Sequence, residues 1–222
     1  MGNKGEMTKD LDSQTDEELM WLVQKDKLEA FEVLAIRYEK RFINFLYKFV
    51  NNRSIAEDIC QQALLRIYKN RKKYRNTGKC STWMYTITAN LARDWLRKNK
   101  RFTFISLDKP VNENTDIIDF CQSPEPNSSK QLEDKELSQM VQRAIDSLPT
   151  HQRLAILLSH YDNLDYHEIG KIMGCSNGTV KSRIFRAKLR LKDLLTGYIA
   201  GKEGEDRNEV LENNQTVTGI FG

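Results

Sequence analysis

The side chains best suited to chemistry in this chain are cations and aromatic rings grouped in two blocks. Residues 66–101 contain twelve Lys or Arg and one acid, Asp94, which gives a net charge of +11. Residues 177–193 contain six basic residues and one acid, for a net charge of +5, whereas the whole chain carries only +4. A concentrated cationic surface binds polyanions, although a run of charge is also typical of an ordinary solvated helix face. The distribution therefore predicts two polyanion-binding modules.

The first basic block combines its cations with aromatic rings and a polar helix face. Rings can stack on unpaired bases for roughly 1–3 kcal/mol each, although each ring could equally fill a core. A polar face runs at helical spacing from Thr86 to Arg97. Its cations could bind the backbone of a single nucleic-acid strand, and its polar groups could hydrogen-bond one or two bases. The candidate residues for single-stranded nucleic acid are Tyr74, Trp83, Tyr85, Asn90, Arg93 and Arg97.

The second basic block follows a tight turn, Gly174-Cys175-Ser176. Two helices joined by such a turn, the second of them basic, are typical of a helix-turn-helix. Ser176 is positioned to cap the second helix. An arginine in the major groove can contact guanine with two donors. The candidate residues for duplex DNA are Thr179, Lys181, Ser182, Arg183, Phe185 and Arg186.

A third candidate surface is acidic and rich in amides. It lies on the solvent side of a helix predicted from Ile55 to Tyr68, and an acidic face is poor for DNA but suits a basic protein partner. Such a face is also what an ordinary exposed helix presents. The candidate residues for a protein partner are Glu57, Asp58, Gln61 and Gln62.

Helical periodicity positions all three surfaces. Thr15 and Glu18 predict a capping box, and an apolar stripe from Leu28 to Phe49 predicts one long helix. Ser54 is the expected cap of the next helix, and a helix over residues 82–98 follows the loop 74–81. In the helix-turn-helix, two inward stripes are expected, the first of Tyr166, Ile169, Ile172 and Met173 and the second of Val180, Ile184, Ala187 and Leu191.

These patterns predict an all-α protein of two small helical domains joined by a flexible acidic linker, the second domain containing the helix-turn-helix. No segment alternates with period two over a useful length, so no strand is expected. Residues 106–136 carry a net charge of −5, with three prolines from 110 to 126. The expected parts are a disordered amino terminus (1–15), an amino-terminal module (16–102), the linker (103–131), a carboxy-terminal module (132–198) and an acidic tail (199–222).

Several classes of protein are disfavoured by what the sequence lacks. No apolar run approaches the roughly 20 residues of a membrane span, and no secretory signal begins the chain, so we expect no membrane insertion and a cytoplasmic location. The four cysteines lie far apart, without zinc-ligand spacing, and are expected to be reduced thiols. The three histidines also lie apart. We therefore expect no metal, no cofactor and no catalytic residue.

Longer motifs resemble those of a known family. Ala56-Glu-Asp-Ile-Cys-Gln61 and Ser81-Thr-Trp-Met-Tyr-Thr-Ile-Thr-Ala-Asn90 resemble conserved region 2 of the extracytoplasmic-function sigma factors. Region 4 of that family is similar to three further segments, Leu148-Pro-Thr-His-Gln-Arg153, Glu168-Ile-Gly, and Gly178-Thr-Val-Lys-Ser-Arg-Ile-Phe-Arg-Ala-Lys188. Gly170 departs from the usual alanine, and we expect it to loosen its helix by up to about 1 kcal/mol.

The resemblance implies a role for each candidate surface. The acidic face would dock on the clamp helices of the largest subunit of core RNA polymerase. Tyr74 and the loop to Ser81 would hold a base flipped from the non-template strand of the −10 element, with Asn90 and Arg93 beside it. The exposed side of the second helix of the helix-turn-helix would read the −35 element. The family also implies an anti-sigma protein as a further partner.

Two other classes of protein compete with this interpretation. A stand-alone helix-turn-helix repressor would need a dimer surface or a ligand pocket, and the sequence has no evident segment for either. An enzyme acting on nucleic acid would need clustered acids or histidines at metal-ligand spacing, which this sequence lacks. A promoter-binding initiation factor accounts for both basic blocks and the acidic linker together.

Overall fold

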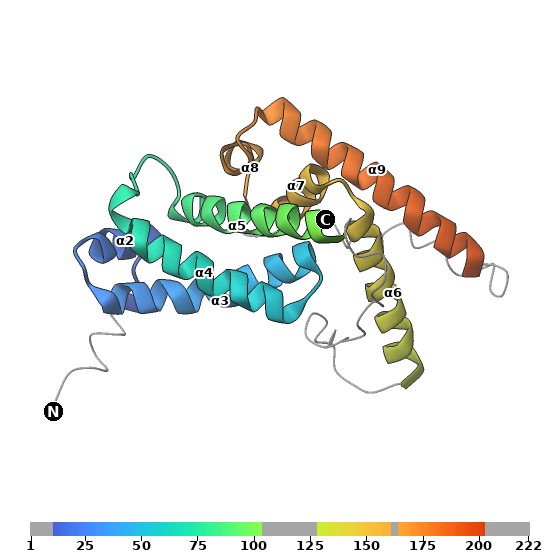
Figure 1. Cartoon of the computed structure of the whole chain (residues 1–222), viewed down its shortest axis with the longest axis horizontal. Coiled ribbons are helices and arrows are strands. Elements are labelled where there is room, and N and C mark those ends of the chain that lie inside the picture. Colours follow the sequence, from blue (N-terminus) through green and yellow to red (C-terminus); the bar gives the residue numbers. More distant parts are fainter. Residues whose placement is uncertain (1–10, 104–127, 161–163, 203–222) are drawn as a thin grey trace.

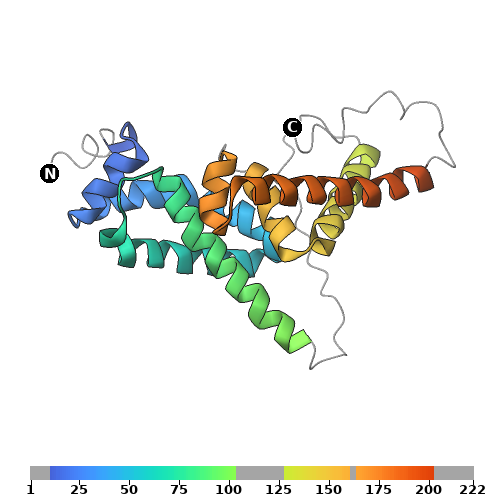
Figure 2. The same cartoon turned by 90° about the horizontal axis from the view of Figure 1, so that it is seen from above.

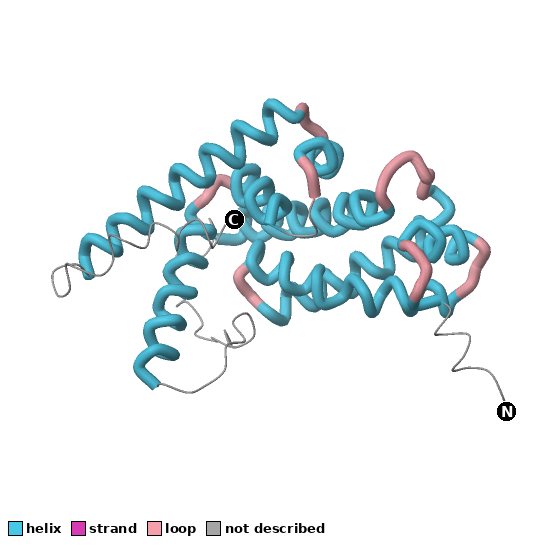
Figure 3. The backbone as a smooth tube through the Cα atoms, turned by 180° about the vertical axis from the view of Figure 1, so that it is seen from behind, coloured by secondary structure: helices cyan, strands magenta, loops and turns pink. Residues whose placement is uncertain are grey.

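The computed structural model describes residues 11–103, 128–160 and 164–202 (Figure 1). These ranges contain helices, short turns and no strand (Figure 3), so the all-α prediction is confirmed. Most of the predicted amino-terminal segment, linker and tail lies outside the described residues. The helices are α2 (Asp16–Gln24), α3 (Leu28–Val50), α4 (Arg53–Asn70), the short 3-10 helix η1 (Arg71–Lys73), α5 (Cys80–Thr103), α6 (Ser128–Ser147), α7 (Thr150–His160), α8 (Tyr166–Met173) and α9 (Asn177–Lys202).

An aromatic core holds the amino-terminal module together. The stripe predicted on α3 is buried, and its rings meet one ring of α5. Phe42 and Phe45 approach Tyr85 edge-on, with ring centroids 5.1 and 5.7 Å apart. Edge-to-face pairs of this kind add about 0.5–1.5 kcal/mol each to the burial of the rings. The rotation of α5 about its own axis is therefore fixed by α3.

Local caps fix where the first helices begin and end. Thr15 and Glu18 form the predicted capping box at the start of α2. Asn51 ends α3 in the left-handed conformation, with φ 54°. The prediction that Ser54 caps the next helix is wrong. Helix α4 begins at Arg53, and the side chain of Asn52 accepts the capping hydrogen bond from the amide of Ile55 at 3.0 Å. Asparagine is among the strongest capping residues, so it takes this position ahead of Ser54.

The carboxy-terminal module contains the predicted helix-turn-helix. Gly174 takes the left-handed conformation, with φ 64°, and ends α8, while the amide of Thr179 donates to Ser176 at the start of α9. Both predicted inward stripes are buried with one exception. Tyr166 is 43% exposed, so its predicted place in the core is wrong. It is the first residue of α8, and Lys181 lies over its ring.

Two helices extend beyond the bounds predicted for the carboxy-terminal module (132–198). Helix α6 begins at Ser128, and α9 continues to Lys202. The four added residues of α6 are polar and carry no apolar period, and the end of α9 contains Gly197 and Gly201, which have low helix propensity. The second helix of the helix-turn-helix is therefore also the long arm of this module, as Figure 2 shows.

The two modules pack against each other. Helix α8 lies on α5, and α6 and α7 approach the carboxyl end of α3. Figures 1 and 2 show α8 beside the first turns of α5 in both views. The described parts of the two modules thus form one continuous structure.

Gly170 has a structural reason to be glycine. A Cβ built on Gly170 would lie 2.8 Å from the carbonyl oxygen of Cys175 and 3.3 Å from the side-chain oxygen of Asn177. The turn folds back here because the amide of Cys175 donates to the Gly170 carbonyl at 3.0 Å. The lack of a side chain at Gly170 lets the turn approach, and the expected loosening of its helix stays a prediction.

We expect Gly170→Ala to lower the free energy of unfolding by about 1–3 kcal/mol, because the added methyl group meets backbone atoms that cannot move aside. Urea denaturation followed by circular dichroism measures this. Gly178→Ala is the matched control, since a Cβ there meets only the Ser176 hydroxyl at 4.0 Å. Equal or higher stability of Gly170→Ala would contradict the explanation.

Candidate nucleic-acid and protein interfaces

Tyr74 supports the loop that precedes α5. Its side chain is only 5% exposed, and its hydroxyl donates to the carbonyl of Gly78 at 3.2 Å and lies 3.4 Å from the side-chain oxygen of Asn76. Burial raises the pKa of the Tyr74 phenol to about 12, so the hydroxyl remains a donor at neutral pH. The ring also packs on Trp83, with centroids 5.4 Å apart. Tyr74 therefore shapes the loop from within.

Tyr85 is not available to nucleic acid in this structure. It is completely buried between the rings of Phe42 and Phe45. The prediction that Tyr85 contacts a DNA strand is corrected accordingly, because a ring in the centre of the core cannot stack on a base. Trp83 is half-buried against Tyr74 and keeps one part of its surface exposed.

The polar face of α5 divides into a covered part and an open part. Asn90 and Arg97 are exposed, and Arg93 is half-buried and donates to the side-chain oxygen of Asn90. Arg97 also pairs with Asp94 at 3.0 Å. Towards the start of the helix, Thr82 is only 7% exposed beneath α8. Hydrogen-bond donors are therefore open to solvent mainly on the second half of this face.

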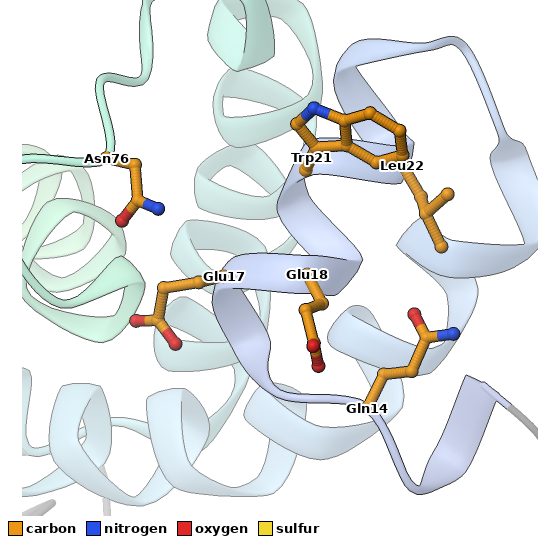
Figure 4. A pocket seen from close by; sticks show the side chains of 6 residues that line it. All are labelled: Gln14, Glu17, Glu18, Trp21, Leu22 and Asn76. Carbon is orange, nitrogen blue, oxygen red and sulfur yellow. The ribbon is translucent and has the colours of Figure 1, made fainter.

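A hollow of about 430 Å³ lies between α2 and the loop that Tyr74 supports (Figure 4). Figure 4 shows Asn76 of the loop facing Glu17, with Trp21 and Leu22 one turn further along α2. Trp21 is 58% exposed. The two carboxylates of the hollow are already engaged, Glu17 by the amide of Cys80 at 2.8 Å and Glu18 by the capping box. The hollow therefore offers the exposed ring of Trp21 and the exposed amide side chain of Asn76.

Trp21 was missed in the sequence because it belongs to neither basic block. A signal was present, since Trp21 lies between Met20 and Val23 on a short helix whose buried side is already occupied. A tryptophan placed off the buried stripe of a helix indicates an interaction surface. Its neighbour Lys25 approaches the ring, with the ammonium nitrogen 5.5 Å from the ring centroid.

The predicted duplex-reading face of α9 is open. Its exposed members are Lys181, Ser182, Phe185 and Arg186, and Phe185 is 68% exposed although it is apolar. Thr179 and Arg183 are half-buried, and Arg183 donates to the sulfur of Cys175 at 3.4 Å. The Ser182 hydroxyl donates to the Gly178 carbonyl at 2.9 Å. The cations at 181 and 186 are thus the freest to reach DNA.

The acidic face of α4 is also open. Asp58, Gln61 and Gln62 are exposed, while Glu57 is partly exposed and pairs with Arg53 at 2.7 Å. Leu65 lies one turn further along and is 59% exposed. A leucine at the end of a polar face adds an apolar contact that the sequence pattern did not single out. The structure thus brings the predicted residues of this face together on one side of one helix.

The thiols and acids of the described residues do not form a metal site. No group of three or more His, Cys, Asp or Glu side chains there is arranged to hold a metal ion. Cys60, Cys80 and Cys175 are free thiols. Burial raises the pKa of Cys60 to about 12 and raises that of Cys80 further, and nearby acids add to both shifts. Among the described helices, none is long and apolar enough to cross a membrane.

Family models match both modules. Residues 34–102 match the model of Sigma-70 region 2, and residues 138–191 match the model of Sigma-70, region 4. The chain is 33% identical over 181 residues to the ECF RNA polymerase sigma-E factor of Escherichia coli K12, covering 78% of this chain and 91% of that protein. It is 30% identical to the RNA polymerase sigma-H factor of Pseudomonas aeruginosa, covering 80% of this chain and 92% of that protein.

Solved structures share the fold. CnrH in complex with the cytosolic domain of CnrY has a TM-score of 0.62 at 19% identity and covers 83% of this chain and 99% of that chain. RpoE of Bartonella quintana, in complex with the anti-sigma factor NepR, has a TM-score of 0.60 at 24% identity and covers 75% of this chain and 96% of that chain. At these identities the likeness concerns the fold.

The thiol pKa values predict a reactivity order. In a Cys121→Ser background at pH 8, a maleimide should modify Cys175 first, because a thiol with a pKa of about 12 is ionised in only roughly one molecule in 10,000. Cys60 and Cys80 should react only after unfolding in urea, and mass spectrometry of peptides measures both stages. Modification of Cys60 as fast as Cys175 in the native protein would contradict the burial described here.

Proposed function

The chain belongs to the sigma-70 family of RNA polymerase sigma factors, in the extracytoplasmic-function group, and from that membership we propose a role for each of its open faces. The proposed function is to bind core RNA polymerase, recognise the −35 and −10 promoter elements and help to melt DNA. The observation that supports it most is that the chain contains two different modules in the family's order. The first exposes the acidic face of α4 and the polar face of α5, and the second exposes the basic face of α9. A stand-alone repressor would need only the second module.

The acidic face of α4 is the proposed docking site for polymerase, on the clamp helices of the largest subunit. Asp58, Gln61 and Gln62 offer hydrogen-bond acceptors and one charge, with Glu57 at the edge of the face. Complementary charge at such an interface steers association and fixes register more than it adds affinity. Leu65 is the proposed apolar anchor beside these polar contacts.

The open part of α5 and the neighbouring loop are the proposed site for the melted −10 strand. Asn90 is the proposed base reader, and Arg93 and Arg97 supply positive charge for the strand backbone. The loop shaped by Tyr74 presents Asn76, and Trp21 offers a ring on which a flipped base can stack. Trp83 is the remaining candidate ring from the first basic block.

The exposed side of α9 is the proposed reader of the −35 element. Arg186 and Lys181 point away from the core on the first turns of the helix, where a helix-turn-helix protein contacts base edges. Phe185 is placed for an apolar contact with a thymine methyl group. Thr179, Ser182 and Arg183 complete the proposed contact set.

No reaction is assigned to the chain itself in this proposal. We propose that it has no catalytic residue, metal or cofactor, and that it acts with polymerase in the cytoplasm. We also propose an anti-sigma protein as a partner, which is supported by the complex in which the similar RpoE was solved. These assignments rest on family membership together with the open faces described above.

The docking proposal predicts the effect of a double substitution. Asp58→Ala with Gln61→Ala should weaken binding to core polymerase roughly 5- to 150-fold, because two contacts worth about 0.5–1.5 kcal/mol each are lost at a desolvated interface. Surface-immobilised core enzyme measures the affinity. Asp193→Ala, which removes the same charge from an exposed position of α9, should leave it unchanged, and equal affinity of the double variant would refute this docking site.

The −35 proposal predicts a promoter-specific loss. Arg186→Ala should reduce open-complex formation on −35-dependent promoters roughly 5- to 150-fold, which corresponds to a lost contact of about 1–3 kcal/mol. Core binding should hardly change. Lys192→Ala is the control, since it removes one charge from an exposed position further along the same helix. A similar loss in both variants would mean that Arg186 supplies only general phosphate attraction.

A further inference from the structure

Helix α9 carries an exposed apolar strip that the proposed DNA contacts use only in part. Phe185 is 68% exposed, and Leu189, one turn further along, is 49% exposed. Residues four apart lie on the same side of a helix, so these two side chains form one strip. The buried side of α9 packs on α6, α7 and α8, so the strip faces away from the module (Figure 1). The proposed −35 contacts include Phe185 and end at Arg186, which leaves Leu189 without an assigned role.

Cations flank this strip on both sides. A helix turns by about 100° per residue, which puts Lys181 and Lys188 on one side of the strip and Arg186 and Arg190 on the other. All four side chains are exposed. No acid occurs between residues 181 and 192. A face of this kind suits an occupant that is apolar at its centre and negatively charged around it.

The segment that follows α9 in the sequence has the complementary pattern. Residues 203–212 lie outside the described residues, and they contain five acids and one arginine, for a net charge of −4. Among the acids is an apolar pair, Val210 and Leu211. Acids close to the carboxyl end of a helix are repelled by its unpaired carbonyl groups, whereas the cations along α9 attract them. Charge therefore favours a segment that turns back along α9.

The length of the segment matches the distance that it must cover. Leu189 lies about 20 Å from the end of α9 at Lys202, because an α-helix rises about 1.5 Å per residue. Gly204 can take the backbone conformations that a reversal of direction requires. With three residues in that turn, residues 206–211 still span about 20 Å when extended. Leu211 can thus return to the level of Leu189.

We propose that residues 203–212 dock on α9, with the apolar pair against Leu189 and the acids beside the flanking cations, and that the docked segment competes with −35 duplex DNA. This inference rests on the proposed role of α9 as the −35 reader. With the apolar pair at Leu189, the acid Glu212 comes near the level of Arg186, which belongs to the proposed DNA contact set. Because only undocked molecules can bind the duplex, the apparent affinity for −35 DNA is reduced by the undocked fraction.

Disulfide trapping measures the docking without DNA. Thr196 is exposed on the same side of α9 as the strip, about 9 Å before the end of the helix. Asn208 reaches the same level, since the three residues after the turn span about 10 Å. Thr196→Cys with Asn208→Cys should therefore form an intramolecular disulfide in the full-length chain under oxidised glutathione. The native cysteines at 121 and 175 are replaced by serine for this test, and those at 60 and 80 are buried.

A charge-neutral change separates docking from chance encounters between the two thiols. Val210→Ser with Leu211→Ser should slow formation of this disulfide roughly 5- to 20-fold, because burial of apolar surface would no longer hold the segment in place. Val217→Ser with Ile220→Ser is the matched control, since it makes the same kind of change beyond the docked segment. The control should leave the rate unchanged. Mass spectrometry of peptides measures the rate in both.

Fluorescence anisotropy with the duplex −35 element of a promoter mapped with the reconstituted polymerase tests the competition. In the native cysteine background, the Val210→Ser and Leu211→Ser double variant should bind the duplex roughly 3- to 10-fold more tightly than the unmodified chain. Leu189→Ser removes the other half of the same contact, lies outside the DNA contact set and should have the same effect. None of these changes alters a charge, so general attraction to DNA cannot account for tighter binding.

The outcomes separate the docking from the −35 assignment. Equal trapping rates in the Val210 and Leu211 double variant and its control would overturn the docking and leave the role of α9 intact. Disulfide-linked dimers in place of monomers would overturn it in favour of a contact between two copies of the chain. Slower trapping with unchanged affinity for the duplex would overturn the competition. Absence of −35 dependence in every variant, with core polymerase present as well, would refute the role of α9 and the competition inferred from it.

Discussion

The functional surfaces of this chain depend on the way α5 is held by the aromatic core. Tyr85 packs edge-on against Phe42 and Phe45, which fixes the rotation of α5 about its axis. The residues on the opposite side of α5 therefore face away from the core. The polar residues Asn90 and Arg97 are therefore presented to solvent, where Asn90 accepts from Arg93 and Arg97 pairs with Asp94 on the same helix. The same core aligns α4, whose buried stripe packs on α3 and whose acidic face points outward. One packing arrangement thus sets both the proposed strand-binding face and the proposed polymerase-docking face.

The polar face of α5 lies in a strongly basic segment, and basic segments attract any suitable anion. One such anion is the carboxylate of Glu168, which pairs with Lys79 beside α5. Glu168 also completes the capping box of α8, so one buried carboxylate both begins a helix of the carboxy-terminal module and contacts the amino-terminal module.

The sequence alone predicted most local features, because they depend on neighbours within one helical turn. The capping box at Thr15, the stripe of α3 and the turn at Gly174 were readable in this way. Errors came where two residues compete or where burial is decided by distant partners. Asn52 caps α4 in place of the predicted Ser54. Tyr85 is buried in the core although it lies within the basic block. The pair of Lys79 and Glu168 joins residues far apart in the chain, and no local period signals it.

The central claim is that the fixed rotation of α5 presents Asn90 to the melted strand, and base preference at the −10 element tests it most directly. Transcription by core polymerase with the Asn90→Ala variant can be measured on promoters that differ at single bases of the −10 element. The account predicts that preference at one −10 base changes while binding to core polymerase stays the same. Unchanged preference at every −10 base would contradict the account.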